Sequence, residues 1–151
     1  MTPEGPASRS LASGSTSPAW DPSSGASRPR AVLVVGDDRA SREGLRAALE
    51  GDGHVVETAP DVWQGLARTR NRDFDAIIVD LDLPPLQGVR LAVRDIVQML
   101  RVYRPRSAMI VVSSEVDAAL LQDARTLRIN ELLEKPISPR ELRAIVRRLS
   151  T

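Results

Sequence analysis

The sequence predicts an α/β protein with a doubly wound parallel sheet, and two observations carry this prediction. First, residues 31–35 (AVLVV) and 74–80 (FDAIIVD) form apolar runs rich in valine and isoleucine. Such runs are typical of strands that are buried on both faces. Second, segments with the apolar spacing of amphipathic helices separate the strand-like runs. Strands that alternate with helices form parallel sheets, and right-handed crossovers make the sheet doubly wound.

Residues 1–30 are predicted to be a disordered tail in front of a domain at 31–151. Serine, glycine and proline fill 16 of these 30 positions, and no apolar period is present. Such a segment cannot bury enough apolar surface to offset the entropy lost on ordering. Trp20 is expected to be an exposed aromatic residue in this tail rather than a docking anchor.

Two strand–helix units are expected in the first half of the domain. Behind the strand at 31–35, apolar residues recur at helical spacing until Gly51 and Gly53 stop the helix. Behind a short strand at 54–59, Pro60 stands near the start of the second helix. The expected helices of this half are 39–53 and 60–72.

Three further units are expected in the second half. Two prolines and a glycine dictate a loop at 81–88, directly after the strand at 74–80. Ser138, Pro139 and Glu141 form a capping box with proline at the first helical position, which predicts the start of the last helix. The remaining expected elements are a helix at 89–103, a strand at 107–113, a helix at 115–128, a strand at 130–134 and a helix within 135–149.

Composition excludes several kinds of site. The chain has no cysteine and a single histidine, His54, so disulfides, thiolate metal sites and histidine clusters are ruled out. The formal net charge of +1 provides no strong field toward nucleic acid or membrane surfaces. No apolar run approaches the roughly 20 residues of a membrane helix, and the N-terminus has no secretory signal. We therefore expect a cytoplasmic protein without direct nucleic-acid or membrane partners.

Polar side chains follow four of the five expected strands. Asp37 and Asp38 follow the first, Asp80 ends the third, Ser113 ends the fourth, and Lys135, the only lysine among 21 basic residues, follows the fifth. In a doubly wound sheet these positions share one edge, where ligands bind. Clustered carboxylates without histidine or cysteine favour a hard ion such as Mg²⁺. A carboxylate beside a cation, an ammonium and a hydroxyl is suited to phosphoryl transfer. The alternative is that these residues only cap helices and solvate strand ends.

On these motifs, the segment from about 31 to 150 resembles the receiver domain of bacterial two-component response regulators. The motifs are VVGDDRASR, IIVDLDLPPLQG, VVSSE and LLEKPIS. The resemblance implies a flavodoxin-like (βα)₅ fold with a five-stranded parallel sheet in the order 2-1-3-4-5. It also implies that a histidine kinase or phosphotransfer protein donates a phosphoryl group to an aspartate, and that Mg²⁺ is required.

Each site residue is implied by its position in these motifs. Asp80 would be the phospho-acceptor, Lys135 would contact the phosphoryl group, and Ser113 would be the hydroxyl that swings toward it. Asp37, Asp80 and the backbone carbonyl of Asp82 would hold Mg²⁺. The other matching positions are Pro84 and Gly88 in the loop after the acceptor, and Pro136, which in the family commonly follows the lysine through a cis peptide.

Three departures from the family pattern bear on the mechanism. Counting back from Arg42, Gly36 stands at the first of two acidic positions, and Asp38 falls just outside the pair. A bulge at Gly36 is the route by which Asp38 could reach the metal instead. Leu132 replaces the usual aromatic switch residue. The segment between the acceptor and the serine is a few residues longer than usual, an excess expected within or after the third helix.

The leading hypothesis is a single-domain response regulator that is not an enzyme. Phosphorylation of Asp80 would alter the face formed by the fourth helix, the fifth strand and the fifth helix, which would then bind a target protein. The first alternative is a pseudo-receiver that binds partners without phosphorylation, because Gly36 removes a metal-binding carboxylate. The second is a phosphatase of the haloacid dehalogenase kind, since IIVDLDLP contains an Asp-x-Asp pair. In those enzymes, however, the nucleophile lies on the first strand.

Overall fold

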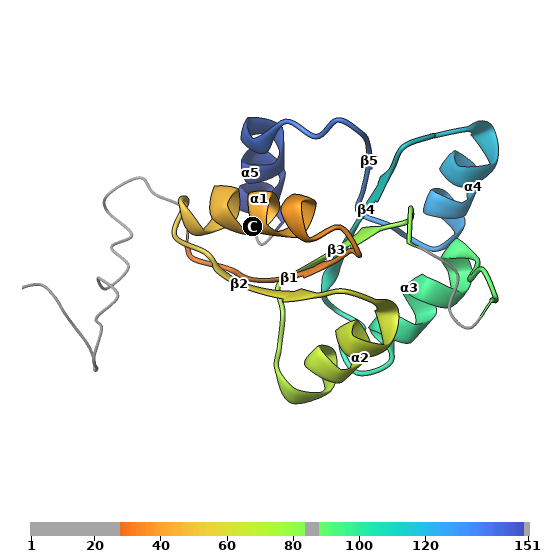
Figure 1. The fold of residues 1–151 in the computed structure, drawn as a ribbon, viewed down its shortest axis with the longest axis horizontal. Helices are drawn as coiled ribbons and strands as arrows, with labels where there is room; N and C mark the ends of the chain where they lie inside the picture. Colours follow the sequence, from red (N-terminus) through yellow and green to blue (C-terminus); the bar gives the residue numbers. More distant parts are fainter. Residues whose placement is uncertain (1–27, 84–87, 150–151) are drawn as a thin grey trace, which may run out of the picture.

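The computed structural model describes residues 28–83 and 88–149 (Figure 1). Most of the predicted tail and Pro84 therefore lie outside the described residues. Within these residues strands and helices alternate, as predicted. In order, the elements are β1 (Ala31–Val35), α1 (Arg39–Glu50), β2 (Val55–Ala59), α2 (Val62–Asn71), β3 (Ala76–Asp80), α3 (Val93–Arg101), β4 (Ala108–Ser113), α4 (Ala118–Thr126), β5 (Glu131–Glu134) and α5 (Pro139–Arg148).

The five strands form one parallel sheet in the order β2-β1-β3-β4-β5, which confirms the predicted fold class and strand order. β1 and β3 pair in the register Val35↔Val79, so the residue after β1, Gly36, stands level with Asp80. The edge at which the strands end, at Val35, Asp80, Ser113 and Glu134, is called the carboxyl edge below. It is the edge at which ligands bind in sheets of this kind.

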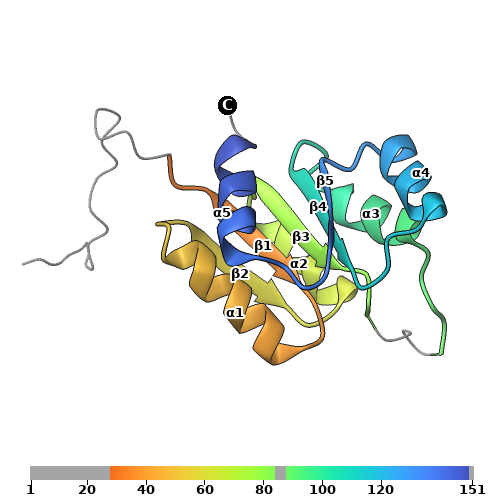
Figure 2. The same cartoon turned by 90° about the horizontal axis from the view of Figure 1, so that it is seen from above.

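Helices cover both faces of the sheet, and each face has its own apolar core. α1 and α5 lie side by side on one face, and α2 and α3 lie on the other (Figures 1 and 2). Val32 and Val34 of β1 face the first core, whereas Leu33 and Val35 face the second, as the two-residue period of a strand requires. Burial of each such side chain stabilises the fold by about 1.5–3 kcal/mol.

Side-chain caps decide where several helices begin. Asp38, Asp61, Asp117 and Ser138 each accept a hydrogen bond from the backbone three residues ahead. The predicted cap at Ser138, with Pro139 at the first helical position, is therefore confirmed at the start of α5. By contrast, α4 begins at Ala118, three residues later than predicted. This difference arises because Asp117, and not a residue at 114 or 115, supplies the cap.

The third helix is shorter than its predicted range of 89–103. Gly88 has a φ of +79°, which glycine adopts without strain, and α3 begins only at Val93. Before it, the partly buried Leu91 packs against the core outside any helix, and Ala92, the last residue before α3, has extended backbone. The long connection on this side of the sheet therefore lies before α3 and not within or after it.

The domain includes the residue just before β1. Arg30 is only 5% exposed, its backbone N–H donates to Nδ1 of His54 at 2.9 Å, and its guanidinium reaches the carbonyl of Arg147 in α5. Arg30 thus ties the start of β1 to α5 and to the turn before β2. In the parts of the chain that the structure describes, no helix has the length and apolar character needed to cross a membrane.

Candidate functional site

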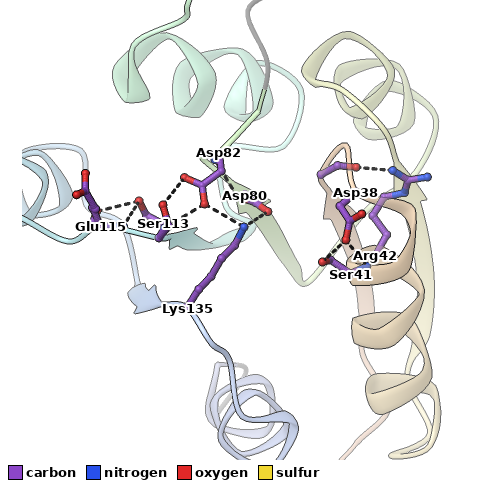
Figure 3. A network of polar contacts seen from close by, with 10 residues as sticks. Asp38, Ser41, Arg42, Asp80, Asp82, Ser113, Glu115 and Lys135 are labelled. Atoms are coloured by element: carbon purple, nitrogen blue, oxygen red, sulfur yellow. Dashed lines mark hydrogen bonds and ion pairs between the residues drawn. The ribbon is translucent and has the colours of Figure 1, made fainter.

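The carboxyl edge brings Asp80 and Lys135 into direct contact (Figure 3). Nζ of Lys135 lies 2.7 Å from Oδ2 of Asp80, across the end of the intervening strand β4. The backbone N–H of Asp82 donates to the other oxygen, Oδ1 of Asp80, at 2.8 Å. Both carboxylate oxygens of Asp80 are therefore engaged, and its side chain is 15% exposed.

Lys135 bridges two carboxylates. Besides Asp80, its ammonium contacts Oδ2 of Asp82 at 3.0 Å. Partial burial alone would lower the pKa of Lys135, but the hydrogen bonds and the attraction of Asp80 and Asp82 outweigh burial, so the pKa is raised above its ordinary value. Lys135 joins Pro136 through a cis peptide bond, as the resemblance implied.

The Asp82 side chain belongs to the site, although sequence reasoning gave a role only to its backbone carbonyl. Its carboxylate accepts hydrogen bonds from the backbone N–H of Ser114 at 3.1 Å and from the Ser114 hydroxyl at 3.2 Å. Burial on its own would raise the pKa of Asp82, but the contacts with Lys135 and Ser114 hold the pKa below its usual value. Asp82 therefore remains a carboxylate at neutral pH.

The two serines at the end of β4, Ser113 within the strand and Ser114 directly after it, have different surroundings. Ser113 is 7% exposed, and its hydroxyl donates to the carbonyl of Glu115 at 2.8 Å, within its own turn. The described contacts of this hydroxyl do not include Asp80. Ser114 instead is the serine that meets the acidic residues of the site, through Asp82. The motif VVSSE places two consecutive serines at this strand end, but their spacing alone could not show which hydroxyl contacts Asp82.

Asp37 and Asp38 also differ in their surroundings. The Asp38 carboxylate accepts from the backbone N–H of Ser41 at 2.9 Å and from its hydroxyl. The side-chain and backbone hydrogen bonds from Ser41 lower the pKa of Asp38. Asp38 thus holds the start of α1 and does not contact Asp80 (Figure 3). Asp37 is exposed, and no hydrogen bond or ion pair of the described residues involves its side chain.

Gly36 leaves space directly beside Asp80. A Cβ at Gly36 would lie 3.4 Å from Cβ of Asp80, an ordinary contact distance, so the position could hold a side chain without displacing its neighbours. The guanidinium of Arg42 donates to the carbonyl of Gly36 at 2.7 Å. Next to this point a cavity of about 580 Å³ opens between α1 and α5, and its wall includes Gly36, Asp80 and Lys135.

The residues of this edge suit a hard cation, although the described residues hold no ready-made group of three or more metal-binding side chains. Oxygen atoms of Asp37, Asp80 and the Asp82 carbonyl are the donors that Mg²⁺ prefers. The exposed Asp37 carboxylate has no partner among the described residues, so it is available to bind an ion at this edge. The site therefore fits Mg²⁺ in residue type, with one carboxylate fewer than the family pattern.

Comparison with known proteins agrees with these observations. The sequence profile of the response regulator receiver domain matches residues 32–147. The KDP operon transcriptional regulatory protein KdpE of Escherichia coli (strain K12) is 38% identical over 116 residues, which are 77% of this chain and 49% of that protein. The chain thus spans about half the length of the curated relatives it matches.

Two solved structures show the same fold. The Vibrio cholerae chemotaxis protein CheY4 has a TM-score of 0.71 at 24% identity, covering 81% of this chain and 99% of that chain. A response regulator protein from Burkholderia pseudomallei, with a phosphorylated aspartic acid, a calcium ion and citrate, has a TM-score of 0.68 at 22% identity. That match covers 79% of this chain and 67% of the other.

Proposed function

The chain belongs to the response regulator receiver domain family, and on that premise we propose that Asp80 accepts a phosphoryl group from a histidine kinase or phosphotransfer protein. The observation that carries this proposal is the contact between Lys135 and Asp80, which joins the only lysine of the chain to the carboxylate at the end of β3. The proposal concerns the domain from Arg30 to Leu149, and the cytoplasm is its proposed location.

The transfer step follows from the chemistry of a carboxylate nucleophile. An oxygen of Asp80 attacks phosphorus and forms a P–O bond, while the P–N bond to the donor histidine breaks and its electron pair remains on the imidazole. The product is an acyl phosphate on Asp80. Its phosphoryl oxygens carry more negative charge than the carboxylate did, and the Lys135 ammonium stands within reach to neutralise part of it.

We propose Mg²⁺ as the cofactor of this site. Asp37, Asp80 and the backbone carbonyl of Asp82 would hold it, and the ion would supply positive charge for the phosphoryl oxygens. With Gly36 in place of a second acid, fewer negative groups attract the ion. Weak Mg²⁺ binding is therefore the expected property that distinguishes this receiver from those with the full acidic pair.

The proposed output is a protein–protein contact on the face formed by α4, β5 and α5. Along α4 no residue is fully buried, and Leu121 is 44% exposed, so this helix is only lightly attached to the domain. Leu132, at the position of the family's aromatic switch, packs partly buried against the core under this face. An aliphatic residue there cannot signal by an aromatic flip, so we propose that α4 itself shifts.

A nuclear magnetic resonance experiment tests the proposal. Acetyl phosphate added with saturating Mg²⁺ is expected to shift amide signals around Asp80, Ser114 and Lys135, and Asp80→Asn is expected to abolish the response. If the wild type and Asp80→Asn behave alike, with no shift in either, the chain is a pseudo-receiver that binds partners without phosphorylation. Gly36 is the specific observation that favours this second candidate. The phosphatase alternative disagrees with the position of Asp80 on β3 rather than on the first strand.

A further inference from the structure

We propose that the Asp82 carboxylate is an internal stand-in for the phosphoryl group, which must leave Lys135 and Ser114 before a phosphoryl group on Asp80 can bind them. The inference rests on the proposed function, because it concerns the anion that Asp80 would carry. It assigns to the Asp82 side chain a role as a brake on phosphorylation, in addition to any role of its backbone carbonyl.

Three donors converge on the Asp82 carboxylate. Oδ2 lies 3.0 Å from Nζ of Lys135 and 3.1 Å from the backbone N of Ser114, and Oδ1 lies 3.2 Å from the Ser114 hydroxyl. One ammonium, one backbone N–H and one hydroxyl are the groups that recognise an anionic oxygen such as that of a phosphoryl group. In this structure the anion that they bind is supplied by the chain itself (Figure 3).

One of these donors, the Lys135 ammonium, also contacts the nucleophile. Lys135 contacts Asp80 and Asp82 at the same time, at 2.7 Å and 3.0 Å. A phosphoryl group attached to Asp80 would therefore place its oxygens near the ammonium that Asp82 already holds. A phosphoryl group carries more negative charge than the Asp80 carboxylate that it would modify, so its repulsion from the Asp82 carboxylate is stronger. The two anions therefore compete for the Lys135 ammonium.

Asp82 is well placed to compete and also able to leave. It is only two residues from Asp80, and its backbone N–H donates to the Asp80 carboxylate at 2.8 Å, which holds the Asp82 backbone near the donors. The Asp82 side chain is nevertheless 35% exposed, which gives it a path into solvent when a stronger anion arrives. The contact between Asp82 and these donors thus opposes phosphorylation of Asp80, but a phosphoryl group can displace the Asp82 carboxylate.

Another role for this carboxylate leads to the opposite expectation. The Asp82 side chain could instead replace the acid missing at Gly36 and bind the metal directly. In that case, removal of Asp82 would weaken Mg²⁺ binding and, with it, the binding of any phosphoryl analogue that needs the metal. A competing Asp82 predicts tighter binding of the analogue.

Beryllofluoride, which binds an aspartate carboxylate as a phosphoryl analogue, separates these cases in the full chain. Its half-saturating concentration is measured at saturating Mg²⁺ through the Ser114 amide signal, for the wild type, Asp82→Ala and Asp82→Asn. We expect about a tenfold lower concentration for Asp82→Ala, because a charge-assisted contact no longer has to be broken. Asp82→Asn, which keeps the size of the side chain, controls for a packing defect. Glu115→Gln removes a nearby negative charge whose carboxylate makes none of these contacts, and is expected to match the wild type.

Each outcome decides the inference. The inference is supported if both Asp82 variants bind beryllofluoride more tightly than the wild type does, including the case in which the wild type shows no binding. Equal binding in all proteins, weaker binding in the variants, or no binding in any of them overturns it. A separate Mg²⁺ titration without beryllofluoride identifies metal ligation if Asp82→Ala lowers Mg²⁺ affinity.

The proposed function is tested separately, by transfer from acetyl phosphate to wild-type Asp80. Transfer to the wild type with no effect of Asp82 rejects the inference alone. If the wild type stays unphosphorylated while the Asp82 variants bind beryllofluoride, the proposed function fails and the inference stands.

Discussion

The ammonium of Lys135 lies 2.7 Å from Oδ2 of Asp80, and this contact joins the end of β3 to the residue that follows β5. The 20 other basic residues of the chain are arginines. A compact ammonium can approach a carboxylate and then follow a phosphoryl oxygen as charge develops, whereas a planar guanidinium imposes a fixed geometry.

Removal of the ammonium should slow phosphorylation. Lys135→Ala removes the nearest positive charge from Asp80, and we expect phosphorylation by acetyl phosphate to slow by about 100-fold, the size typical for loss of one transition-state donor. The rate can be followed by intact-protein mass spectrometry. Arg140→Ala, which removes an equal charge from the exposed start of α5, should leave the rate unchanged. An unchanged rate in Lys135→Ala would show that Lys135 has no part in the transfer.

Restoring the missing acid should strengthen Mg²⁺ binding. Gly36→Asp adds a carboxylate beside Asp80, where the structure has room for its Cβ. We expect Mg²⁺ affinity to rise by about tenfold or more, since affinity for a hard cation follows the number of charged ligands. Calorimetric titration measures this affinity. Gly44→Asp, on an open position of α1, adds the same charge farther along the cavity wall and serves as the control. Equal affinities in the two variants would contradict a metal site at Gly36.

Loss of the Asp38 carboxylate should affect the helix and not the metal. Asp38→Ala removes the acceptor for the backbone N–H of Ser41, so we expect a lower melting temperature. Mg²⁺ affinity should stay close to that of the wild type, because this carboxylate faces the start of α1. Asp37→Ala should show the reverse pattern, with weak Mg²⁺ binding and little change in melting temperature. The reverse assignment of these effects would mean that Asp38, not Asp37, binds the ion.

Protonation of His54 should destabilise the fold below about pH 6.5. Burial is the main cause of the lowered pKa of His54, opposed by Asp52 and assisted by Arg30 and Arg147, and Asp75 opposes it weakly. The unfolded chain therefore binds a proton that the folded chain resists. Stability is fully present above about pH 6.5 and falls as the pH drops from there through the folded pKa.

Urea denaturation between about pH 5.5 and 7 measures this effect, a window that stays above the ordinary titration range of aspartate and glutamate side chains. His54→Asn can keep an acceptor for the backbone N–H of Arg30, and we expect the free energy of unfolding of this variant to depend less on pH. An identical pH dependence in the wild type and in His54→Asn would assign the effect to other groups.

Two glycines should respond to alanine in opposite directions. A Cβ at Gly65 would lie 3.0 Å from Cγ2 of Val35 and 3.2 Å from Cδ2 of Leu100, so Gly65→Ala should destabilise the fold by about 1–3 kcal/mol through overpacking. Gly44 has open space around it within α1, so Gly44→Ala should stabilise the helix by up to about 1 kcal/mol. Urea denaturation measures both values. A stabilised Gly65→Ala variant would contradict the close approach of α2 to β1.

The fold could be predicted from the sequence because three of the five strands, β1, β3 and β4, are short and almost wholly apolar runs. The runs ending at Val35 and Asp80 show burial on both faces directly, and the helices between them have the matching period. The residues at which α3 and α4 begin could not be predicted from the sequence. They depend on the extended backbone at Ala92 and on the cap at Asp117, and neither changes the apolar period of the helix that follows.

The site could be predicted in its position but not in its contacts. The convergence of Asp80 and Lys135 follows from strand ends alone, because parallel strands end at the same edge. The side-chain directions of Asp38, Asp82 and Ser114 depend on local hydrogen bonds that compete for each carboxylate. Two adjacent aspartates or two adjacent serines have the same sequence signal, so only the structure distinguishes the capping residue from its neighbour.

The most direct test of the central claim locates the phosphoryl group on the chain. The wild type is treated with acetyl phosphate and Mg²⁺, the acyl phosphate is reduced with borohydride, and peptides are mapped by mass spectrometry. We predict homoserine at Asp80 and at no other aspartate, with none in Asp80→Asn. Absence of homoserine at Asp80, or its appearance at Asp37, Asp38 or Asp82 instead, would contradict the assignment of Asp80 as the phospho-acceptor.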